Sequence, residues 1–423
     1  MGRIKKDNWG LEILLIQRLS KVNSFENIYL NLQKATTIQP ILKDATLEST
    51  AMETTEAALE STAMETTEAT LQSTAMETTE TIQHHFVPLV SAGSNHSLVA
   101  ISGHSSVYVC GDNKNGQLGI KQNDNLLTFK EYKLPFIVGN FIICGWDTSF
   151  IIDDNGTTWA CGDNRNGLLG VGQDLSTREW SKISQLEECV KVACGLQHTL
   201  FLLKDGSVFG CGKLGRSLGK LFPTNDKLDW KPIRAKVNNV VDIACGMYHC
   251  ILLTRKGQVL VFGKEKFNLL GSPAPTPAPA ENEGEIHLSP SVMDSNDHVT
   301  RLFSSWSTGF LSTRRGNLFA WGRCDLGQFN PLPGTVDSNQ KSTSTLTRIN
   351  LGLNEIIQFS AGSEFAIAQL SNRKLAVWGY NEHGNLGMGH VENVFDPVIL
   401  DGIPNQVIAF SAGYGHSLII TDK

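Results

Sequence analysis

The sequence lacks long apolar runs near its start and has no paired cysteines. The run Ile13-Leu14-Leu15-Ile16 is ended by Gln17 and Arg18, so it is too short for a membrane span or a signal-peptide core. Nine cysteines are spread singly, without a C-x-x-C pair. An odd number without metal spacing favours reduced thiols over disulfides or a zinc site. We therefore expect a cytoplasmic protein, also present in the nucleus, with no membrane span.

Charge is also scarce. Charged residues make up 18% of the chain, against about 25% in typical soluble proteins. There are 36 basic and 42 acidic residues, for a net charge of −6. This balance gives no general attraction for a polyanion, so no nucleic-acid partner is expected. Glycine occupies 39 positions, which suits short strands joined by tight turns.

The first 85 residues divide into two parts. Residues 1–45 form an N-terminal extension with a basic excess, and Leu11 to Leu32 has enough apolar positions for an amphipathic helix. A disordered or weakly helical extension is one interpretation, and a membrane-surface or targeting helix is the other. Residues 46–81 hold three dodecamers built on L-x-S-T-A-M-E-T-T-E. Their few large apolar side chains predict an acidic, low-complexity spacer.

A longer repeat begins at residue 86. A small residue and a glycine, usually followed three positions later by histidine, recur at the anchors Gly93, Gly145, Gly195, Gly246, Ser305, Gly362 and Gly413, spaced by 50 to 59 residues. A second glycine follows each of the first six anchors after 17 or 18 residues. Within a copy, short β-branched runs are split by glycine-bearing turns, which predicts one small antiparallel sheet. Such sheets bury both faces only by stacking in a ring. The sequence therefore predicts an all-β, seven-bladed β-propeller over residues 86–423.

The loop motifs carry a family resemblance. The loop G-D-N-K-N-G-Q-L-G at 111–119, and its looser copy at 379–387, resemble the regulator of chromosome condensation repeat family of seven-bladed propellers. The segments C-G-W-D at 144–147, W-G-R-C-D-L-G-Q at 321–328 and W-G-Y-N-E-H-G at 378–384 are similar to exchange factors of that family that are linked to secretion. The resemblance covers residues 86–423.

The family's ring closure has no counterpart in the sequence. In the family, an N-terminal strand pair ending in W-G-x-N-x-x-G-Q-L-G completes the last blade. Residues 411–423 supply the C-terminal half, but nothing in residues 1–85 carries the partner motif. Ile28 to Leu32 could pair as a strand, but it lacks the Trp-Gly and the loop glycines. Either the seventh blade is incomplete or its first segment has been replaced. An incomplete blade leaves Ser417 to Thr421 as an open edge.

Strand alternation assigns the candidate binding residues to one face. The turns after the anchors and the loops after the third strands emerge together. Near the central opening and further out they present the candidates Trp146, Asp147, Tyr248, Trp306, Glu364, Asn381, Glu382 and Tyr414. Aromatics flanked by carboxylates are common in protein interfaces. The alternative is that Trp146 and Trp306 only fill gaps between blades.

Catalytic chemistry is not indicated. His96, His198, His249 and His416 occur once per blade, too far apart to hold one metal ion, and each is expected to donate a hydrogen bond to a neighbouring blade's backbone. No phosphate-binding loop, nucleophile elbow or carboxylate pair is present. We expect no catalytic residue, no metal and no cofactor.

The resemblance implies guanine nucleotide exchange on a small GTPase, a reaction that needs no acid or base. The wedge of the family's founding member has no counterpart, because the second and third blades, with spacings of 50 and 51 residues, leave no room for it. The long insertions, Ser272 to Ala280 and Pro331 to Arg348, are predicted to be flexible loops. The competing hypothesis is a non-catalytic scaffold for a partner of the exocyst type, or for translation and tRNA-modification proteins. A monomer is expected in either case.

Overall fold

The computed structural model describes residues 2–4, 12–16, 88–172, 176–223, 228–264, 266–270, 283–286, 296–331, 341–403 and 405–422. The predicted spacer at 46–81 lies outside these residues. In the described part, every element except the short helix α1 (Leu214–Leu218) is a strand. No helix there is long and apolar enough to cross a membrane. The predicted all-β propeller is confirmed.

Six sheets are each built from four consecutive antiparallel strands. The first contains β3 (Pro88–Ala92), β4 (His96–Ile101), β5 (Ser106–Gly111) and β6 (Leu126–Lys133). The second contains β7 (Val138–Cys144), β8 (Thr148–Asp153), β9 (Thr158–Gly162) and β10 (Thr177–Lys182). The third contains β11 (Cys189–Cys194), β12 (His198–Leu203), β13 (Val208–Gly212) and β14 (Asp229–Arg234).

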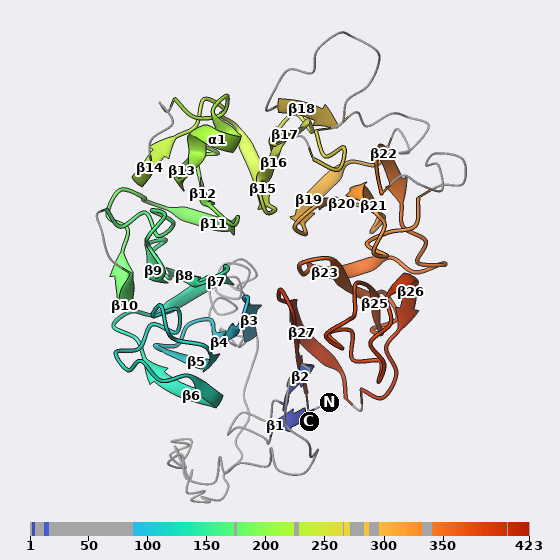
Figure 1. The fold of residues 1–423 in the computed structure, drawn as a ribbon, viewed down its shortest axis with the longest axis horizontal. Helices are drawn as coiled ribbons and strands as arrows, with labels where there is room; N and C mark the ends of the chain where they lie inside the picture. The colour runs from blue at the N-terminus through green and yellow to red at the C-terminus, as the bar shows by residue number, and fades with distance from the viewer. Residues whose placement is uncertain are drawn as a thin grey trace, which may run out of the picture. The chain divides into compact units, whose positions relative to one another are not determined.

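The remaining three continue around the ring (Figure 1). The fourth sheet contains β15 (Val240–Cys245), β16 (His249–Thr254), β17 (Val259–Gly263) and β18 (Glu283–Ile286). The fifth contains β19 (Val299–Ser304), β20 (Thr308–Thr313), β21 (Leu318–Arg323) and β22 (Ser342–Arg348). The sixth contains β23 (Ile356–Ala361), β24 (Phe365–Leu370), β25 (Leu375–Gly379) and β26 (Val394–Ile399).

A seventh sheet joins the two ends of the chain. It runs from β27 (Val407–Ala412) through β28 (Ser417–Thr421) and β2 (Glu12–Ile16) to β1 (Gly2–Ile4). All five residues of β28 pair with β2, from Ser417 opposite Ile16 to Thr421 opposite Glu12. The incomplete seventh blade and the open edge at Ser417–Thr421 are therefore wrong. The helix expected from Leu11 is also wrong for Glu12–Ile16, where the E-I-L-L-I run is a strand.

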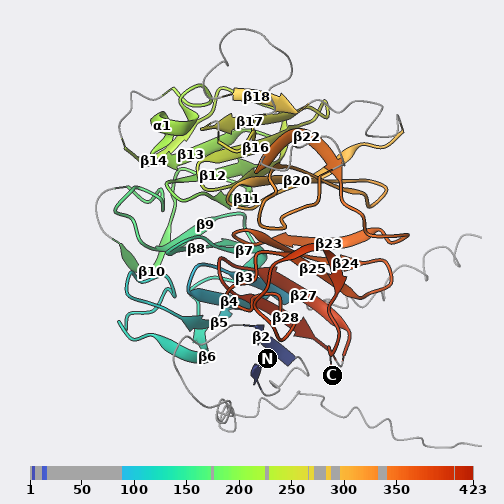
Figure 2. The same cartoon turned by 45° about the vertical axis from the view of Figure 1, so that its right-hand side comes forward.

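The closing strands differ from those of the other sheets. In the other six sheets the third strand comes before the outermost strand along the chain. In the seventh sheet the order is reversed, because the outermost strand β1 comes before β2, which occupies the third place. The pairing needs only backbone hydrogen bonds, which explains why it forms without the Trp-Gly and loop glycines of the expected motif. Inside the ring, β27 lies beside β3 (Figure 1 and Figure 2), and the backbone N–H of Tyr414 donates to the Gly93 carbonyl at 3.0 Å.

Apolar side chains between neighbouring sheets form the core. One cluster joins Ile251 and Val261 of the fourth sheet to Leu311 and Trp321 of the fifth. Trp321 is fully buried, and its Nε1 donates to the Leu269 carbonyl of the preceding sheet at 3.0 Å. Trp378 is also buried, one sheet further on, and donates in the same way to the Gln328 carbonyl at 2.8 Å. Each Trp-Gly motif thus fastens its sheet to the one before.

Two predicted loops contain strands. Pro331 to Arg348 was expected to be flexible throughout, but Ser342–Arg348 is β22, paired with β21. The acidic continuation of the Pro-Ala stretch contains β18, paired with β17. Outermost strands make few contacts with the core, so their polar sequences show little apolar alternation. That is why sequence patterning missed both.

Candidate partner-binding face

The two faces of the propeller are built from different turns. The inner strands β3, β7, β11, β15, β19, β23 and β27 surround the centre (Figure 1) and end at the anchor residues. We call the face with the anchor turns the anchor face. The opposite face carries the hairpin turns between the second and third strands, and we call it the hairpin face.

Three aromatic side chains meet at the centre of the anchor face. Trp146, Trp306 and Tyr414 each directly follow an anchor, in the second, fifth and seventh sheets. Their ring centroids are 5.6 Å apart for Trp146 and Trp306, 5.3 Å for Trp146 and Tyr414, and 5.5 Å for Trp306 and Tyr414. These separations lie within the favourable range for aromatic pairs. All three rings remain partly exposed. We call them the aromatic trio.

Backbone hydrogen bonds between sheets hold the trio in place. The Trp306 N–H donates to the Ser363 carbonyl at 2.8 Å, and the Trp306 carbonyl accepts from the Met247 N–H at 3.1 Å. The Ser363 hydroxyl donates to the Tyr414 carbonyl at 2.5 Å. Trp306 and Tyr414 are thus tied to neighbouring sheets, and the Trp146 carbonyl accepts from the Ser94 hydroxyl of the preceding sheet, so the trio rests on a rim of inter-sheet hydrogen bonds.

The anchor glycines permit this close approach. A Cβ on Gly362 would lie 2.5 Å from the Gly413 carbonyl oxygen, and one on Gly413 would lie 2.7 Å from that of Gly93. Such distances are too short for a side-chain carbon, so the inter-sheet rim needs glycine at both positions.

Below the trio, a cavity of about 220 Å³ is lined by the inner strands. Trp306 and Tyr414 border it at one end, and Cys144, Cys194 and Cys245 contribute to its wall. Burial raises the pKa of the Cys144 thiol to about 12 and also raises the pKa values of Cys194 and Cys245 well above their ordinary value. These thiols are therefore protonated at neutral pH and are poor nucleophiles. No group of three or more metal-ligating side chains occurs among the described residues.

Asp147 stands next to the trio and bonds to the preceding sheet. Its carboxylate accepts hydrogen bonds from Asn115 Nδ2 at 3.2 Å and Gln117 Nε2 at 3.4 Å. Burial raises the pKa of Asp147, and the nearby carboxylates Asp163 and Asp112 raise it further. The residue is partly exposed, so it remains available to a partner at the edge of the trio.

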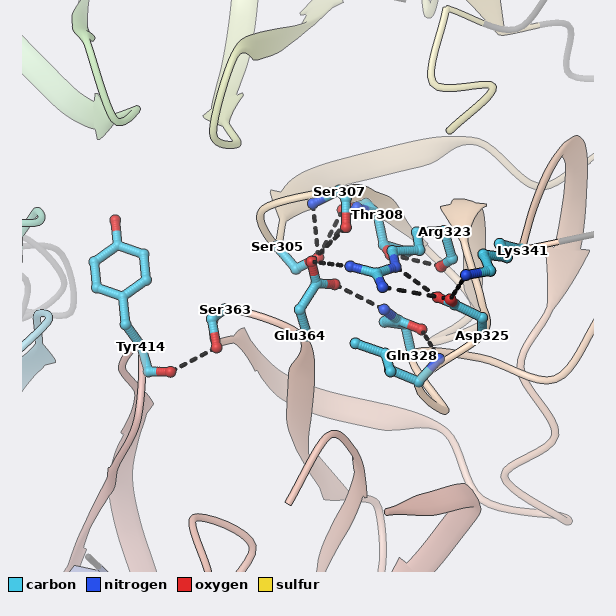
Figure 3. A network of polar contacts seen from close by, with 11 residues as sticks. Ser305, Ser307, Thr308, Arg323, Asp325, Gln328, Lys341, Ser363, Glu364 and Tyr414 are labelled. Atoms are coloured by element: carbon cyan, nitrogen blue, oxygen red, sulfur yellow. Dashed lines mark hydrogen bonds and ion pairs between the residues drawn. The ribbon is translucent and has the colours of Figure 1, made fainter. Parts of the chain in front are cut away.

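Glu364 is the internal counterpart of Asp147. Its side chain is only 8% exposed, and its carboxylate accepts from Ser307 Oγ at 2.5 Å and Gln328 Nε2 at 2.8 Å. Arg323 lies between two carboxylates, with Nη1 3.6 Å from Glu364 Oε1 and Nε 2.5 Å from Asp325 Oδ1 (Figure 3). Burial raises the pKa of Glu364, opposed by these hydrogen bonds and by Arg323. Glu364 therefore links the fifth and sixth sheets and offers little surface to a partner.

The other predicted residues separate in the same way. Asn381 is fully buried, with Nδ2 donating to the His390 and Glu392 carbonyls and Oδ1 accepting from the Leu386 N–H. It shapes its loop and presents no exposed surface. Glu382 is exposed and accepts from the Tyr380 hydroxyl at 2.7 Å. Tyr248 is partly exposed, with Lys264 Nζ 4.8 Å from its ring centre.

The four repeat histidines are structural, as predicted, but three of them bond to a side chain where a backbone partner was predicted. Nε2 of His96 contacts Ser149 Oγ at 2.8 Å, that of His249 contacts Ser304 Oγ at 2.9 Å, and that of His416 contacts Ser97 Oγ at 2.8 Å. In each case the partner is a serine hydroxyl of the next sheet and not its backbone. The Nε2 atom of His198 is buried without a hydrogen-bond partner.

Sequence reasoning missed the residues that hold the two carboxylates. Gln117 and Gln328 each lie six positions after the second glycine of their repeat, and each bonds to the acid two positions after the next anchor. Where the loop position is leucine, as at 168, 218 and 269, the following sheet has no acid at the corresponding place. This pairing of glutamine with an acid was a usable signal for contacts between sheets.

Comparisons with known proteins agree with this architecture. The model of the RCC1-like domain matches residues 57–419. The mouse secretion-regulating guanine nucleotide exchange factor is 30% identical over 363 residues, covering 78% of this chain and 75% of its own length. The bovine protein of the same name is 29% identical, with the same coverage.

Among solved structures, Prp20p of Saccharomyces cerevisiae has a TM-score of 0.67 at 21% identity, covering 79% of this chain and 82% of its own. That structure was described together with its binding properties to Gsp1p and histones, and it supports the fold. With a family model matching most of its length, this chain belongs to the RCC1-like domain family.

Proposed function

We propose that this chain regulates a small GTPase as a guanine nucleotide exchange factor, and that it acts through the anchor face. The observation that carries the proposal is the aromatic trio, a rigid and partly exposed cluster with the carboxylate of Asp147 beside it. Clustered aromatics are the residue types that dominate binding energy in protein interfaces. The mouse and bovine relatives are named as exchange factors, which supports the same activity here.

Exchange by such a face needs no chemical step on the propeller. A protein that binds the nucleotide-free GTPase more tightly than the nucleotide-bound form weakens nucleotide binding by the same factor. The anchor face has what this requires, because the inter-sheet hydrogen bonds hold its central rings before a partner arrives. A preorganised surface loses less conformational entropy on binding. Asp147 and the exposed Glu382 add negative charge that can attract basic groups near a GTPase nucleotide site.

The proposal also includes the setting of this activity. The secretion link in the names of the mouse and bovine relatives leads us to propose a GTPase of the secretory pathway, with an exocyst-type protein as a further partner. All nine cysteines are free, which is consistent with the reducing environment of the cytoplasm or nucleus.

Release of labelled GDP from a panel of small GTPases is the direct test. The wild-type chain should accelerate release from at least one of them. Trp306→Ala removes one ring of the trio, and truncation of a central interface aromatic costs about 2 kcal/mol or more. The acceleration at subsaturating propeller concentration should therefore fall at least about tenfold.

Phe395→Ala is the matched control. Phe395 is an exposed aromatic on the outer strand β26, away from the trio, and its removal should leave GDP release unchanged. Thermal unfolding of both variants checks that the fold is retained. If no GTPase in the panel responds to the wild-type chain while partner proteins still bind the anchor face, the exchange activity is refuted and the scaffold function takes its place.

A further inference from the structure

The hairpin face carries an apolar feature that the fold does not require. Each of the inner strands β11, β15 and β23 has a register shift that leaves one residue between paired neighbours. These residues are Val190, Val241 and Ile357, and they are 46%, 45% and 47% exposed. Bulges of this kind redirect a side chain and are frequent beside functional sites. We call the three residues the apolar ring.

The bulge alone does not explain an apolar residue. In the fifth sheet the shift falls between Val299 and Arg301, which places the exposed polar residue Thr300 at the corresponding position. A polar side chain is therefore compatible with the same backbone geometry. Three exposed β-branched aliphatic residues at equivalent places are a property of this surface and not of the strand pairing.

Basic hairpins lie next to the ring on the same face. The turns of the fourth, fifth and sixth sheets read Arg255-Lys256-Gly257, Arg314-Arg315-Gly316 and Asn372-Arg373-Lys374. They contain six basic residues and no acidic one, and all six are exposed. We call these six the basic arc. By contrast, the turns of the second and third sheets contain Asp154 and Asp205.

Hydrogen bonds fix the arc beside the ring. The Arg255 N–H donates to the Asn239 carbonyl at 2.7 Å, and Asn239 lies two residues before Val241. The Ser371 N–H, at the start of the sixth-sheet turn, donates to the Glu355 carbonyl at 2.8 Å, two residues before Ile357. The fourth-sheet and sixth-sheet hairpins are therefore held directly against the strands that carry Val241 and Ile357.

Five of the six arc residues differ in their charge environment from Arg315, whose backbone N–H donates to the Asp297 carboxylate at 3.3 Å. No carboxylate within the described part of the chain forms an ion pair with Arg255, Lys256, Arg314, Arg373 or Lys374. The nearby Lys191 differs, because its Nζ is 2.6 Å from Asp242 Oδ1 in an inter-sheet ion pair. A Cβ added at Gly257 would meet no atom within 4 Å, so the space around that turn is open.

We propose that the apolar ring and basic arc form a second docking surface, which binds an acidic segment of a partner protein that also carries aliphatic side chains. The arc would attract the acidic groups by charge complementarity, and the ring would take up the aliphatic ones. Nucleic acid fits less well, because its phosphates would make no favourable contact with the aliphatic side chains of the apolar ring. The surface lies opposite the aromatic trio, so it is independent of nucleotide exchange.

The test uses fluorescence anisotropy with the full chain and labelled probes of about twelve residues. One peptide alternates glutamate with leucine, a second alternates glutamate with serine, and a third probe is a single-stranded oligonucleotide of similar charge. We expect the glutamate–leucine peptide to bind most tightly, and its affinity to fall as salt is raised, since screening weakens exposed charge pairs.

Two charge reversals locate the site. Lys256→Glu and Lys374→Glu, both on exposed turns, should each weaken binding of the glutamate–leucine peptide by about threefold to tenfold. Lys114→Glu makes the same change in charge on an exposed loop of the anchor face and should have little effect. GDP release should be unchanged in the two arc variants, which separates this site from the proposed exchange activity.

Three results would each overturn the proposal. The first is no measurable binding of the glutamate–leucine peptide. The second is an equal loss of binding in Lys114→Glu, which would indicate non-specific attraction to net charge. The third is tighter binding of the oligonucleotide than of either peptide, which would assign the arc to nucleic acid.

Discussion

Mild acid should destabilise this propeller through its buried histidines. Burial lowers the pKa values of His96 and His249 to about 3 and those of His198 and His416 to about 4, from an ordinary 6.5. Between these values the unfolded chain binds protons that the folded chain does not. The histidine contribution to stability is therefore fully present above pH 6.5 and is lost as the pH falls towards 4 and then 3.

The expected size follows from the pKa differences. A pH of 5 lies 1.5 units below the ordinary histidine pKa of 6.5, and each unit corresponds to about 1.36 kcal/mol. Each buried histidine therefore lowers the free energy of unfolding at pH 5 by ~2 kcal/mol. If the four act independently, the free energy of unfolding falls by at most about 8 kcal/mol. Whole domains are stable by about 5–15 kcal/mol, so this loss is a large fraction of the total and a marked destabilisation near pH 5 is expected.

Urea unfolding followed by tryptophan fluorescence at pH 7.5, 6 and 5 measures the effect. His198→Phe is the informative variant, because the His198 ring lies over Gly195 just as the ring of Phe365 lies over Gly362 in the sixth sheet. The variant should lose about 2 kcal/mol less than wild type between pH 7.5 and pH 5. His383→Gln, at an exposed position, is the control and should follow the wild type.

The carboxylates are the same in the wild type and in His198→Phe, so their contributions cancel in this comparison. Their ordinary pKa values are about 4, and burial raises the pKa of Glu364, so its protonation at low pH opposes the histidine effect. An identical loss of stability in His198→Phe and the wild type would refute the assignment of acid sensitivity to the repeat histidines.

Two further substitutions test how the ring is held together. Gly413→Ala should lower the free energy of unfolding, measured by urea titration, by about 1–3 kcal/mol, because the new Cβ would lie 2.7 Å from the Gly93 carbonyl oxygen. Gly415→Ala is the control: a Cβ there would lie 3.7 Å from its nearest neighbouring atom, so the free energy of unfolding should hardly change. Leu14→Pro interrupts β2 opposite Ile419, so it should uncover β28 and give lower thermal stability with concentration-dependent aggregation by light scattering. A monodisperse Leu14→Pro protein with wild-type stability would show that β2 is not needed for closure.

The interior of the propeller was predictable because the repeat imposes it. The anchor glycines, the Trp-Gly motifs and the histidines recur at fixed offsets, and most of them make equivalent contacts with a neighbouring sheet, as His96, His249 and His416 do with serine hydroxyls. Closure was not predictable, because the strand Glu12–Ile16 pairs through its backbone and carries none of the family's loop motif. The outer strands β18 and β22 escaped detection for a similar reason, since few core contacts constrain their sequences.

The candidate site was predicted in part. Sequence reasoning placed Trp146, Trp306 and Tyr414 on one face, but residues in three separate sheets give no sign in the sequence that their rings come together. It also counted Glu364 and Asn381 as surface groups. Their burial depends on hydrogen-bond partners that for Glu364 lie up to 57 residues away along the chain, as Ser307 does, and the face assignment alone does not include those partners.

Departures from the repeat are therefore the best guide to function in this chain. The residue after each anchor lies in the inter-sheet rim, and at Ser94 and Ser363 the side chain itself bonds to the next sheet, whereas the aromatic rings at this position take no part in those hydrogen bonds. The residue is Ser94, Trp146, Leu196, Met247, Trp306, Ser363 and Tyr414 in turn. At the bulge positions and hairpin turns of the opposite face, the backbone geometry likewise does not dictate which side chain is present. The stacking of the sheets explains neither the aromatic rings at the positions after the anchors nor the aliphatic and basic side chains at the bulges and hairpin turns. Binding at two faces does explain them, and the trio and arc variants test each face separately.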